Sequence, residues 1–202
     1  MKKREDMNIK NELVIDDFIY MEQMEKKYYS EEYITPYEEA YRWYLSNPSG
    51  GAVLEDDGVI VGFTDVLPVK QEIFDQTVNG TFNDRNLTAE ALISMEELRE
   101  GDSVNLLFSC VLVEKEYRKT DALRMLLDAT MDYYRGFAEK GICIDSIAAS
   151  NVTEAGVRFS ERMGFERIGS SDHQTALFRT SFREFDERVR RMPIRSAVSS
   201  TL

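Results

Sequence analysis

Three basic residues cluster around one predicted turn of this 202-residue chain. Arg118, Lys119 and Arg124 lie in the segment 114–124, which follows an apolar run and precedes a helical pattern. The first N–H groups of a helix have no partner within the helix, and its N-terminus carries partial positive charge, so such a turn can bind a phosphate group. The same spacing also fits a solvated helix end with Thr120 as its N-cap. The residues alone leave both interpretations open.

The chain as a whole is acidic, so an anionic ligand would need a local basic cluster of this kind. It has 25 Lys and Arg residues against 37 Asp and Glu residues, a net charge of -12. This charge disfavours nonspecific binding to nucleic acid or to an anionic membrane, and it favours a cationic substrate. No apolar stretch has the length of a membrane span, and no His and Cys cluster suggests a metal site. We therefore expect a cytoplasmic protein with no metal, no nucleic-acid partner and no membrane partner.

Two apolar runs flank the turn and predict the elements that position it. Residues 104–113 and 142–149 are nearly continuous apolar runs, which are typical of strands covered on both faces. Between them, apolar side chains recur at helical spacing from Leu123 to Phe137. A strand, a helix and a second strand in this order predict parallel neighbours with a right-handed connection. We therefore expect a parallel pair of strands at the centre of the fold.

The rest of the chain predicts elements around this pair. Helices are expected over residues 13–29, 36–45, 88–98 and 153–163, the second with Thr35 as its N-cap. A hairpin around Asp57-Gly58 is expected over residues 52–63, an irregular segment over 67–86, and short strands at 165–168 and 176–182. These elements predict a single α/β (α+β) domain over residues 1–182, with a mixed central β-sheet flanked by helices. The dense charge over residues 183–202 predicts a C-terminal tail that frays.

The residues around the turn resemble the motifs of a known family. The stretch Val113-Glu114-Lys115-Glu116-Tyr117-Arg118, followed by an amphipathic helix, is similar to the central motif of the GNAT N-acetyltransferases. The stretch from Asn151 to Gly169, which contains Met163-Gly164-Phe165, resembles a later helix motif of that family. The resemblance covers residues 104–182 in detail. It implies a GNAT-like fold and the transfer of an acetyl or other acyl group from acetyl-CoA to a primary amine of a small molecule or a protein.

The resemblance also implies where acetyl-CoA, as co-substrate, would bind. Its pantetheine arm would lie along the strand backbone at Val111, Leu112 and Val113, and Asn151 would face that arm. Its pyrophosphate would lie on the turn and the start of the helix, at Arg118, Lys119, Thr120, Asp121, Ala122, Leu123 and Arg124. Three of these positions, Lys119, Asp121 and Leu123, usually hold glycine in the family, so weakened or rearranged binding of the phosphates is expected here.

The catalytic groups are expected near the end of the central strand and on the later helix. Glu114 is the candidate general base, with Asp65 and Glu72 as lesser candidates. Ser160 aligns with the tyrosine that protonates the leaving thiolate in many members of the family, and a serine hydroxyl is a much weaker acid. Cys110 would need a nearby base to act as a nucleophile, and His173 is the sole histidine.

Two kinds of function therefore remain open. The first is a working acyltransferase, and the second is a GNAT-like binding or regulatory module that has lost catalysis, which the missing glycines and the missing tyrosine favour. The two cysteines, Cys110 and Cys143, lie in apolar segments and are expected to be reduced, buried thiols. The residues leave the oligomeric state open, and a dimer is possible.

Overall fold

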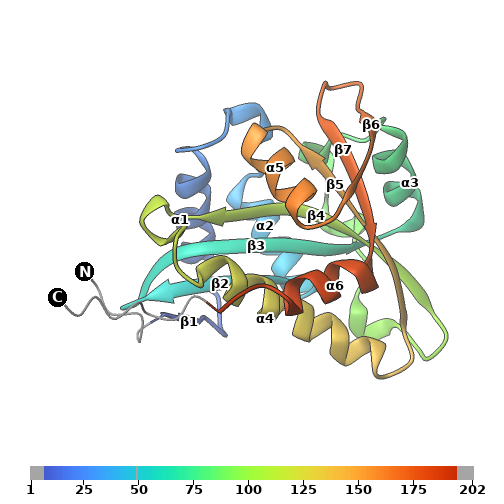
Figure 1. The fold of residues 1–202 in the computed structure, drawn as a ribbon, viewed down its shortest axis with the longest axis horizontal. Helices are drawn as coiled ribbons and strands as arrows, with labels where there is room; N and C mark the ends of the chain where they lie inside the picture. The colour runs from blue at the N-terminus through green and yellow to red at the C-terminus, as the bar shows by residue number, and fades with distance from the viewer. Residues whose placement is uncertain (1–6, 49, 195–202) are drawn as a thin grey trace.

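The computed structural model describes residues 7–48 and 50–194, and within them seven strands form one sheet (Figure 1). Their order across the sheet is β1-β2-β3-β4-β5-β7-β6. β4 and β5 pair in parallel, and the other neighbours pair antiparallel. The predicted mixed sheet with a central parallel pair is confirmed. The strands are β1 (Met7–Ile9), β2 (Gly51–Asp56), β3 (Val59–Val69), β4 (Ser103–Val113), β5 (Cys143–Asn151), β6 (Glu166–Ser170) and β7 (Ala176–Ser181).

Helices cover both faces of the sheet. One face carries α1 (Ile15–Glu25), α2 (Tyr37–Ser46) and α3 (Gln71–Asn79), and the other carries α4 (Ala122–Ala138), α5 (Glu154–Arg162) and α6 (Phe182–Arg190). Successive residues of β4 alternate between the two layers, as expected for a strand buried on both sides. Leu106 and Phe108 pack with the α4 side, whereas Leu107 packs with Trp43 and Phe74 on the other side.

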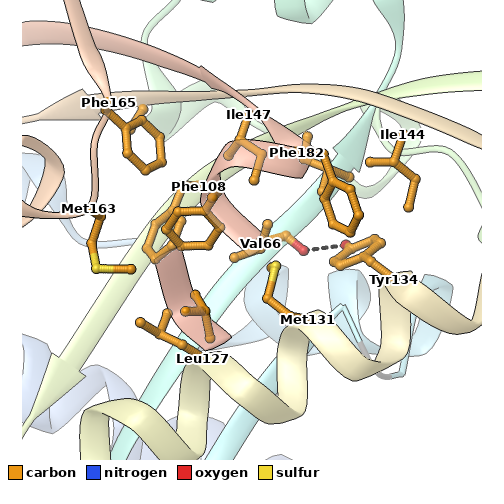
Figure 2. Packing of buried hydrophobic residues seen from close by; sticks show 14 of the residues in the cluster. Val66, Phe108, Leu127, Met131, Tyr134, Ile144, Ile147, Met163, Phe165 and Phe182 are labelled. Carbon is orange, nitrogen blue, oxygen red and sulfur yellow. Dashed lines mark hydrogen bonds between the residues drawn. The ribbon is translucent and has the colours of Figure 1, made fainter. Parts of the chain in front are cut away.

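The larger hydrophobic core fixes α4 against the strands that precede and follow it. Figure 2 shows Phe182 and Met131 beside Tyr134, with Phe108 and Leu127 farther along the same core. The Tyr134 side chain is fully buried, and its hydroxyl donates a hydrogen bond to the Val66 carbonyl of β3. This bond satisfies the polar atom of a buried ring. The direction of α4, and so the place of its N-terminus beside the end of β4, is thereby determined.

The hairpin predicted around Asp57-Gly58 is confirmed, with β2 and β3 as its strands. Both turn residues have positive φ, 52° at Asp57 and 75° at Gly58, which matches the preference of two-residue hairpin turns. β3 continues to Val69, and α3 then occupies residues that were expected to be irregular. The Asn79-Gly80 turn is the end of α3, with Gly80 at a φ of 78° as its C-cap.

The helix α6 corrects the predicted tail. Phe182, Phe185 and Val189 are buried at helical spacing against the core, while the charged side chains point outward. Ser181 begins the helix, because its hydroxyl accepts from the Glu184 N–H while the Glu184 carboxylate bonds back to Ser181. The domain therefore extends past residue 182 to include α6. The end of the predicted tail, residues 195–202, lies outside the described residues.

Three smaller predictions also differ from the structure. The helix expected over 88–98 is wrong, because this segment forms two short 3-10 turns, Ala89–Ala91 and Met95–Glu97. The N-cap position of α2 is Pro36 rather than Thr35, and the Glu22 carboxylate accepts from the Tyr37 N–H. Cys143 is exposed at the start of β5, where its thiol donates to Asp145, whereas Cys110 is partly buried.

No helix among residues 7–48 and 50–194 is both long enough and apolar enough to cross a membrane. Within the same residues, no group of three or more His, Cys, Asp or Glu side chains is arranged to hold a metal ion.

Candidate active site

The parallel strands β4 and β5 stay paired over only part of their length. Their last paired residues are Phe108 and Ala149, although β4 continues to Val113 and β5 to Asn151. β4 also has an irregularity at this point, because Ser109 is skipped in the pairing with β3. An extra residue of this kind bends a strand locally. The strands separate beyond this point, and we call the space between their ends the wedge cleft.

The wedge cleft has a volume of about 820 Å³, within the size range of small-molecule sites. Residues of both strand ends line it, from Phe108 to Val113 in β4 and at Ser150 and Asn151 in β5. The start of α4, the length of α5 and the end of α6 complete the wall on one side of the sheet. The loops that follow α1 and α3, together with the turn between β6 and β7, complete the other side.

The backbone of β4 turns hydrogen-bonding groups into the cleft. The Glu114 N–H donates to the Val61 carbonyl at 2.9 Å, so this residue faces β3. Since backbone groups of successive strand residues point to opposite edges, Val111 and Val113 face the cleft. The Val113 carbonyl accepts from Arg118 Nε at 2.9 Å, whereas Val111 has no backbone partner on this edge among the described residues. An extended ligand with amide groups can pair with this edge.

Arginines dominate the charge of the cleft. Among the described residues that line it, six are arginines and the single carboxylate is Glu25. In a chain with a net charge of -12, this arrangement creates a local positive potential that suits an anionic ligand. The arginines are Arg85, Arg118, Arg158, Arg162, Arg188 and Arg191.

The structure divides the predicted cofactor-binding residues into two groups. The cleft is lined by Val111, Leu112, Val113, Arg118, Leu123 and Asn151, and it is not lined by Lys119, Thr120, Asp121, Ala122 or Arg124. The second group is turned into the fold or away from the cleft. Thr120 Oγ1 accepts from the Ala122 N–H at 3.2 Å, Ala122 is fully buried, and Arg124 Nε lies 3.4 Å from Asp128. Arg118 therefore supplies the positive charge of this turn to the cleft.

Arg118 is held in place by two contacts. Its guanidinium carbon lies 4.8 Å from the centre of the Tyr28 ring, in a cation–π contact, and its Nε bonds to Val113. Both contacts leave the terminal nitrogens of the guanidinium available for a ligand.

The start of α5 presents two polar side chains to the cleft. Thr153 is the N-cap of this helix, and its hydroxyl accepts from the Gly156 N–H at 3.0 Å. Asn151 Nδ2 donates to Ser160 Oγ at 2.7 Å, and Ser160 is buried. A Cβ at Gly156 would lie 2.8 Å from Asn151 Oδ1, so only glycine allows this close approach. Because Ser160 accepts from Asn151, its own hydroxyl hydrogen remains free to donate to a group in the cleft.

The structure places Glu114 outside the wedge cleft. Its carboxylate bonds to Lys27 Nζ and accepts from the Tyr28 hydroxyl at 2.9 Å, and it does not line the cleft. The hydrogen bond from Lys27 lowers the pKa of Glu114 below its usual value. A carboxylate with a lowered pKa takes up a proton weakly, so Glu114 is poorly suited to act as a general base.

A partly buried group of side chains lies beside the cleft, and we define it as the acidic cluster: Glu25, Asp65, Cys110 and Tyr29. Burial, followed by the negative charge of Asp65, raises the pKa of Glu25 to about 8. Burial also raises the pKa of Asp65 to about 7. Glu25 and Tyr29 lie close enough to the Cys110 thiol to influence its pKa, and Glu25 lines the wedge cleft. Carboxyl groups with a pKa near neutrality are suited to general base catalysis.

The chemistry of Cys110 follows from these neighbours. Burial and the two carboxylates raise the pKa of its thiol well above the usual value, so the nucleophilic thiolate is disfavoured. His173 lies in the turn between β6 and β7 and lines the cleft, whereas the charged groups that act on the Cys110 thiol are Glu25 and Asp65. Glu72 lies outside the cleft on α3, where it accepts from Gln76 at 3.3 Å. Of the lesser candidates for a base, only Asp65 therefore belongs to the acidic cluster.

Sequence reasoning missed Glu25 and Tyr29, although α1 carried a signal. Phe18 and Met21 lie on its buried face, and Glu25 and Tyr29 continue the same face at helical spacing. A carboxylate in line with buried apolar residues is unusual and marks a candidate functional group. Glu25 and Cys110 lie 85 positions apart in the sequence, and this separation concealed their proximity.

The fold matches solved structures, although no family model and no curated protein matches the chain. The loading GNATL domain of CurA from Lyngbya majuscula has 16% identity and a TM-score of 0.60, over 88% of this chain and 98% of that one. A GNAT-like decarboxylase, GphF, in complex with isobutyryl-CoA has 14% identity and a TM-score of 0.58, over 88% and 99%. The PaiA N-acetyltransferase of Thermoplasma acidophilum, in complex with coenzyme A, has 15% identity and a TM-score of 0.51, over 87% and 98%. The chain therefore has the GNAT fold.

Proposed function

We propose that this protein transfers an acetyl or related acyl group from acyl-CoA to a primary amine of a small molecule or a protein. The observation that carries this proposal is the position of Glu25, with a pKa of about 8, in an arginine-lined cleft between separated parallel strands. The GNAT fold supports it, since structures with this fold include an N-acetyltransferase bound to coenzyme A and a decarboxylase bound to isobutyryl-CoA.

The residues of the wedge cleft fit acyl-CoA in shape and charge. The free backbone edge at Val111 suits the amide groups of the pantetheine arm, and Asn151 faces the same space from β5. Arg118, which lines the cleft shortly before the start of α4, suits the pyrophosphate. In the cleft, the strand edge that can pair with amide groups therefore lies next to a positively charged end. The pantetheine arm and the pyrophosphate follow each other in the same order in acyl-CoA.

The thioester, when bound, supplies an acyl group that is reactive toward an amine. Glu25 accepts the proton that the amine must lose before its nitrogen can form the new bond, and the nearby Asp65 keeps the pKa of Glu25 high enough for this step. Ser160 donates a hydrogen bond toward the sulfur that departs. The proton that this sulfur finally takes up comes from water, because a serine hydroxyl is too weak an acid to give its own.

The acceptor amine reaches the acidic cluster from the other side of the sheet. Tyr33, Phe82 and His173, which come from three different loops, line that part of the cleft. The aromatic side chains provide apolar walls, and the negative charge of the protein as a whole attracts a cationic amine.

Two measurements on purified protein test this proposal. The first is the shift of the thermal unfolding midpoint with acetyl-CoA, where ligand at 100 times Kd adds about 2.7 kcal/mol to the free energy of unfolding. We expect a shift for the native protein and for the control Lys115→Ala, an exposed residue of the same turn outside the cleft, and a reduced shift for Arg118→Ala. The second is the release of free thiol with a panel of amines.

The outcomes separate the two kinds of function. Binding together with amine-dependent release of thiol supports an acyltransferase. Binding of acyl-CoA without transfer to any amine supports a binding or regulatory module instead. No shift at saturating acetyl-CoA or longer acyl-CoAs contradicts the acyltransferase and supports a binding or regulatory module that has lost acyl-CoA binding.

A further inference from the structure

We propose that the groove between α3 and the sheet is a second small-molecule site, which binds a free amino acid through its carboxylate and its ammonium group. The groove has a volume of about 700 Å³ and is lined by α3 and by parts of β4, β5 and β7. No described residue lines both this groove and the wedge cleft. The site is therefore separate from the proposed acyl-CoA site, and the inference goes beyond the proposed function.

Polar side chains interrupt the two central apolar strands where these strands line the groove. Asn105 of β4 and Ser146 of β5 are only 8% and 6% exposed. Polar groups in such a place cost free energy unless they are hydrogen-bonded. The Ser146 N–H donates to Asn105 Oδ1 at 3.1 Å, and Asn105 Nδ2 donates to Gln71 Oε1 of α3 at 3.0 Å. These bonds fix the floor of the groove and tie it to the helix.

An irregularity in β5 turns two consecutive side chains toward the groove. In the pairing with β4, β5 has one extra residue between Ile144 and Ile147. Both isoleucines pack in the larger core on the α4 side of the sheet. Asp145 and Ser146, which lie between them, both line the groove on the other side. An extra residue of this kind redirects side chains and is common next to functional sites.

Arg179 of β7 supplies the positive charge of the groove. Its Nε and Nη2 donate to Ser146 Oγ at 3.3 and 3.0 Å, and its guanidinium carbon lies 5.7 Å from the centre of the Phe74 ring. One edge of the guanidinium is thereby held, and the terminal nitrogens keep hydrogens that can donate to a ligand. Arg179 is exposed, and it forms no ion pair with a carboxylate among the described residues.

Two carboxylates line the same groove. Asp75 of α3 accepts from Gln71 Nε2 at 2.8 Å, and Asp145 accepts from the Cys143 thiol at 3.0 Å. Both side chains are exposed, and neither forms an ion pair in the described part of the chain. Because Arg179 does not pair with either carboxylate, the groove keeps charges of both signs available to one ligand.

An amino acid matches these charges. Its carboxylate can accept two hydrogen bonds from the terminal nitrogens of Arg179, and its ammonium group can donate to Asp75 and Asp145. A phosphate ester fits less well, because its two negative charges would face the two carboxylates. A simple amine would leave Arg179 without a partner.

Thermal unfolding of the native protein with each standard amino acid, at about 10 mM and without acyl-CoA, is the first test. We expect at least one amino acid to raise the unfolding midpoint by about 2 °C or more, as for a ligand well above its Kd. The α-amide of that amino acid lacks the carboxylate, and its N-acetyl form lacks the ammonium group. We expect each derivative to bind about tenfold more weakly in calorimetric titration.

Calorimetric titration of the same amino acid into variants locates the site. The groove variants are Arg179→Gln and the double substitution Asp75→Asn with Asp145→Asn. The matched control is Arg167→Gln, which removes an exposed arginine of β6 outside the groove. We expect each groove variant to weaken binding by about tenfold and the control to change it by less than about twofold. The double variant keeps the test valid if Arg179→Gln unfolds, because both aspartates are exposed.

The other outcomes overturn the inference. The absence of a midpoint shift with every standard amino acid, or an equal loss of binding in Arg167→Gln, would show that the groove is not an amino-acid site. Binding that survives in both groove variants but is lost in Glu25→Gln would place the amino acid in the wedge cleft as an acceptor. That result would contradict this inference and support the proposed function, so the two can fail separately.

Discussion

The raised pKa of Glu25 makes the stability of this protein depend on pH in an unusual direction. Below pH 4.5 the carboxyl is protonated in both the folded and the unfolded state and contributes nothing. Between pH 4.5 and about 8 the folded state keeps a proton that the unfolded state releases, so the free energy of unfolding falls as pH rises. Above about pH 8 the carboxyl is ionised in both states, and the folded protein retains a buried charge.

Replacement of Glu25 by Gln removes this dependence, because glutamine does not ionise. One pKa unit is worth about 1.4 kcal/mol, so a change from 4.5 to about 8 sets an upper limit of about 5 kcal/mol. Solvent in the open cleft and the coupling to Asp65 reduce this value, and we expect about 1–2 kcal/mol. Glu25→Gln should therefore gain about 1–2 kcal/mol of stability relative to the native protein between pH 5 and pH 9.

Urea unfolding at intervals from pH 5 to pH 9 measures this gain, with Glu72→Gln as a control for an exposed carboxyl outside the cleft. The rate of acyl transfer gives an independent reading. In the native protein it should rise with pH through about 7 to 8 as Glu25 loses its proton, and in Glu25→Gln this limb should be lost together with most of the rate. A stability difference between Glu25→Gln and native protein that stays constant within about 0.3 kcal/mol across this range would refute the reasoning.

Three further substitutions test other parts of the structure. Glu114→Gln should leave the rate of acyl transfer within about twofold of the native rate, because Lys27 and Tyr28 hold the Glu114 carboxylate outside the cleft. A loss of two orders of magnitude in this rate would show that Glu114 is the base. Gly156→Ala should weaken acetyl-CoA binding by about three- to tenfold in calorimetry, because its Cβ would displace Asn151, and unchanged affinity would show that Asn151 is dispensable. Phe185→Ala should lower the free energy of unfolding by about 3–4 kcal/mol in urea titrations, and a loss below about 1 kcal/mol would mean that α6 is only loosely attached.

The central elements were predictable because their signals are local and agree with each other. The apolar run that became β4 is buried on both faces, and Thr153 and Gly164 mark the two ends of the α5 segment. The hairpin at Asp57-Gly58 follows from the turn residues alone. In each case a single stretch of chain carries both the pattern and its boundaries.

The segments that were predicted wrongly carry conflicting sequence patterns. In α6, the charges of Arg183, Arg188 and Arg190 outweighed the three buried apolar residues at helical spacing. Segment 88–98 had a cap-like threonine, yet short 3-10 turns allow Leu92 and Met95 to reach the core. Tertiary packing determined the structure of both segments, and local sequence propensities do not reflect tertiary packing.

The candidate site shows the same limit. The strand ends and Arg118 were predicted because they belong to one continuous motif. The candidate base could not be found in this way. Glu25 lies near Cys110 only because α1 packs on the face of the sheet opposite to α4. Burial, which a sequence does not display directly, is also what turns an ordinary glutamate into a group with a pKa near neutrality.

Amide hydrogen exchange of the protein with and without saturating acetyl-CoA would locate the ligand most directly. If the wedge cleft binds acyl-CoA, exchange should slow in the part of β4 from Ser109 to Val113, at the start of α4 and along α5, because these segments line the cleft. Unchanged exchange in these segments would contradict binding in the cleft. Protection confined to the separate groove between α3 and β7, around Gln71 and Arg179, would contradict it equally.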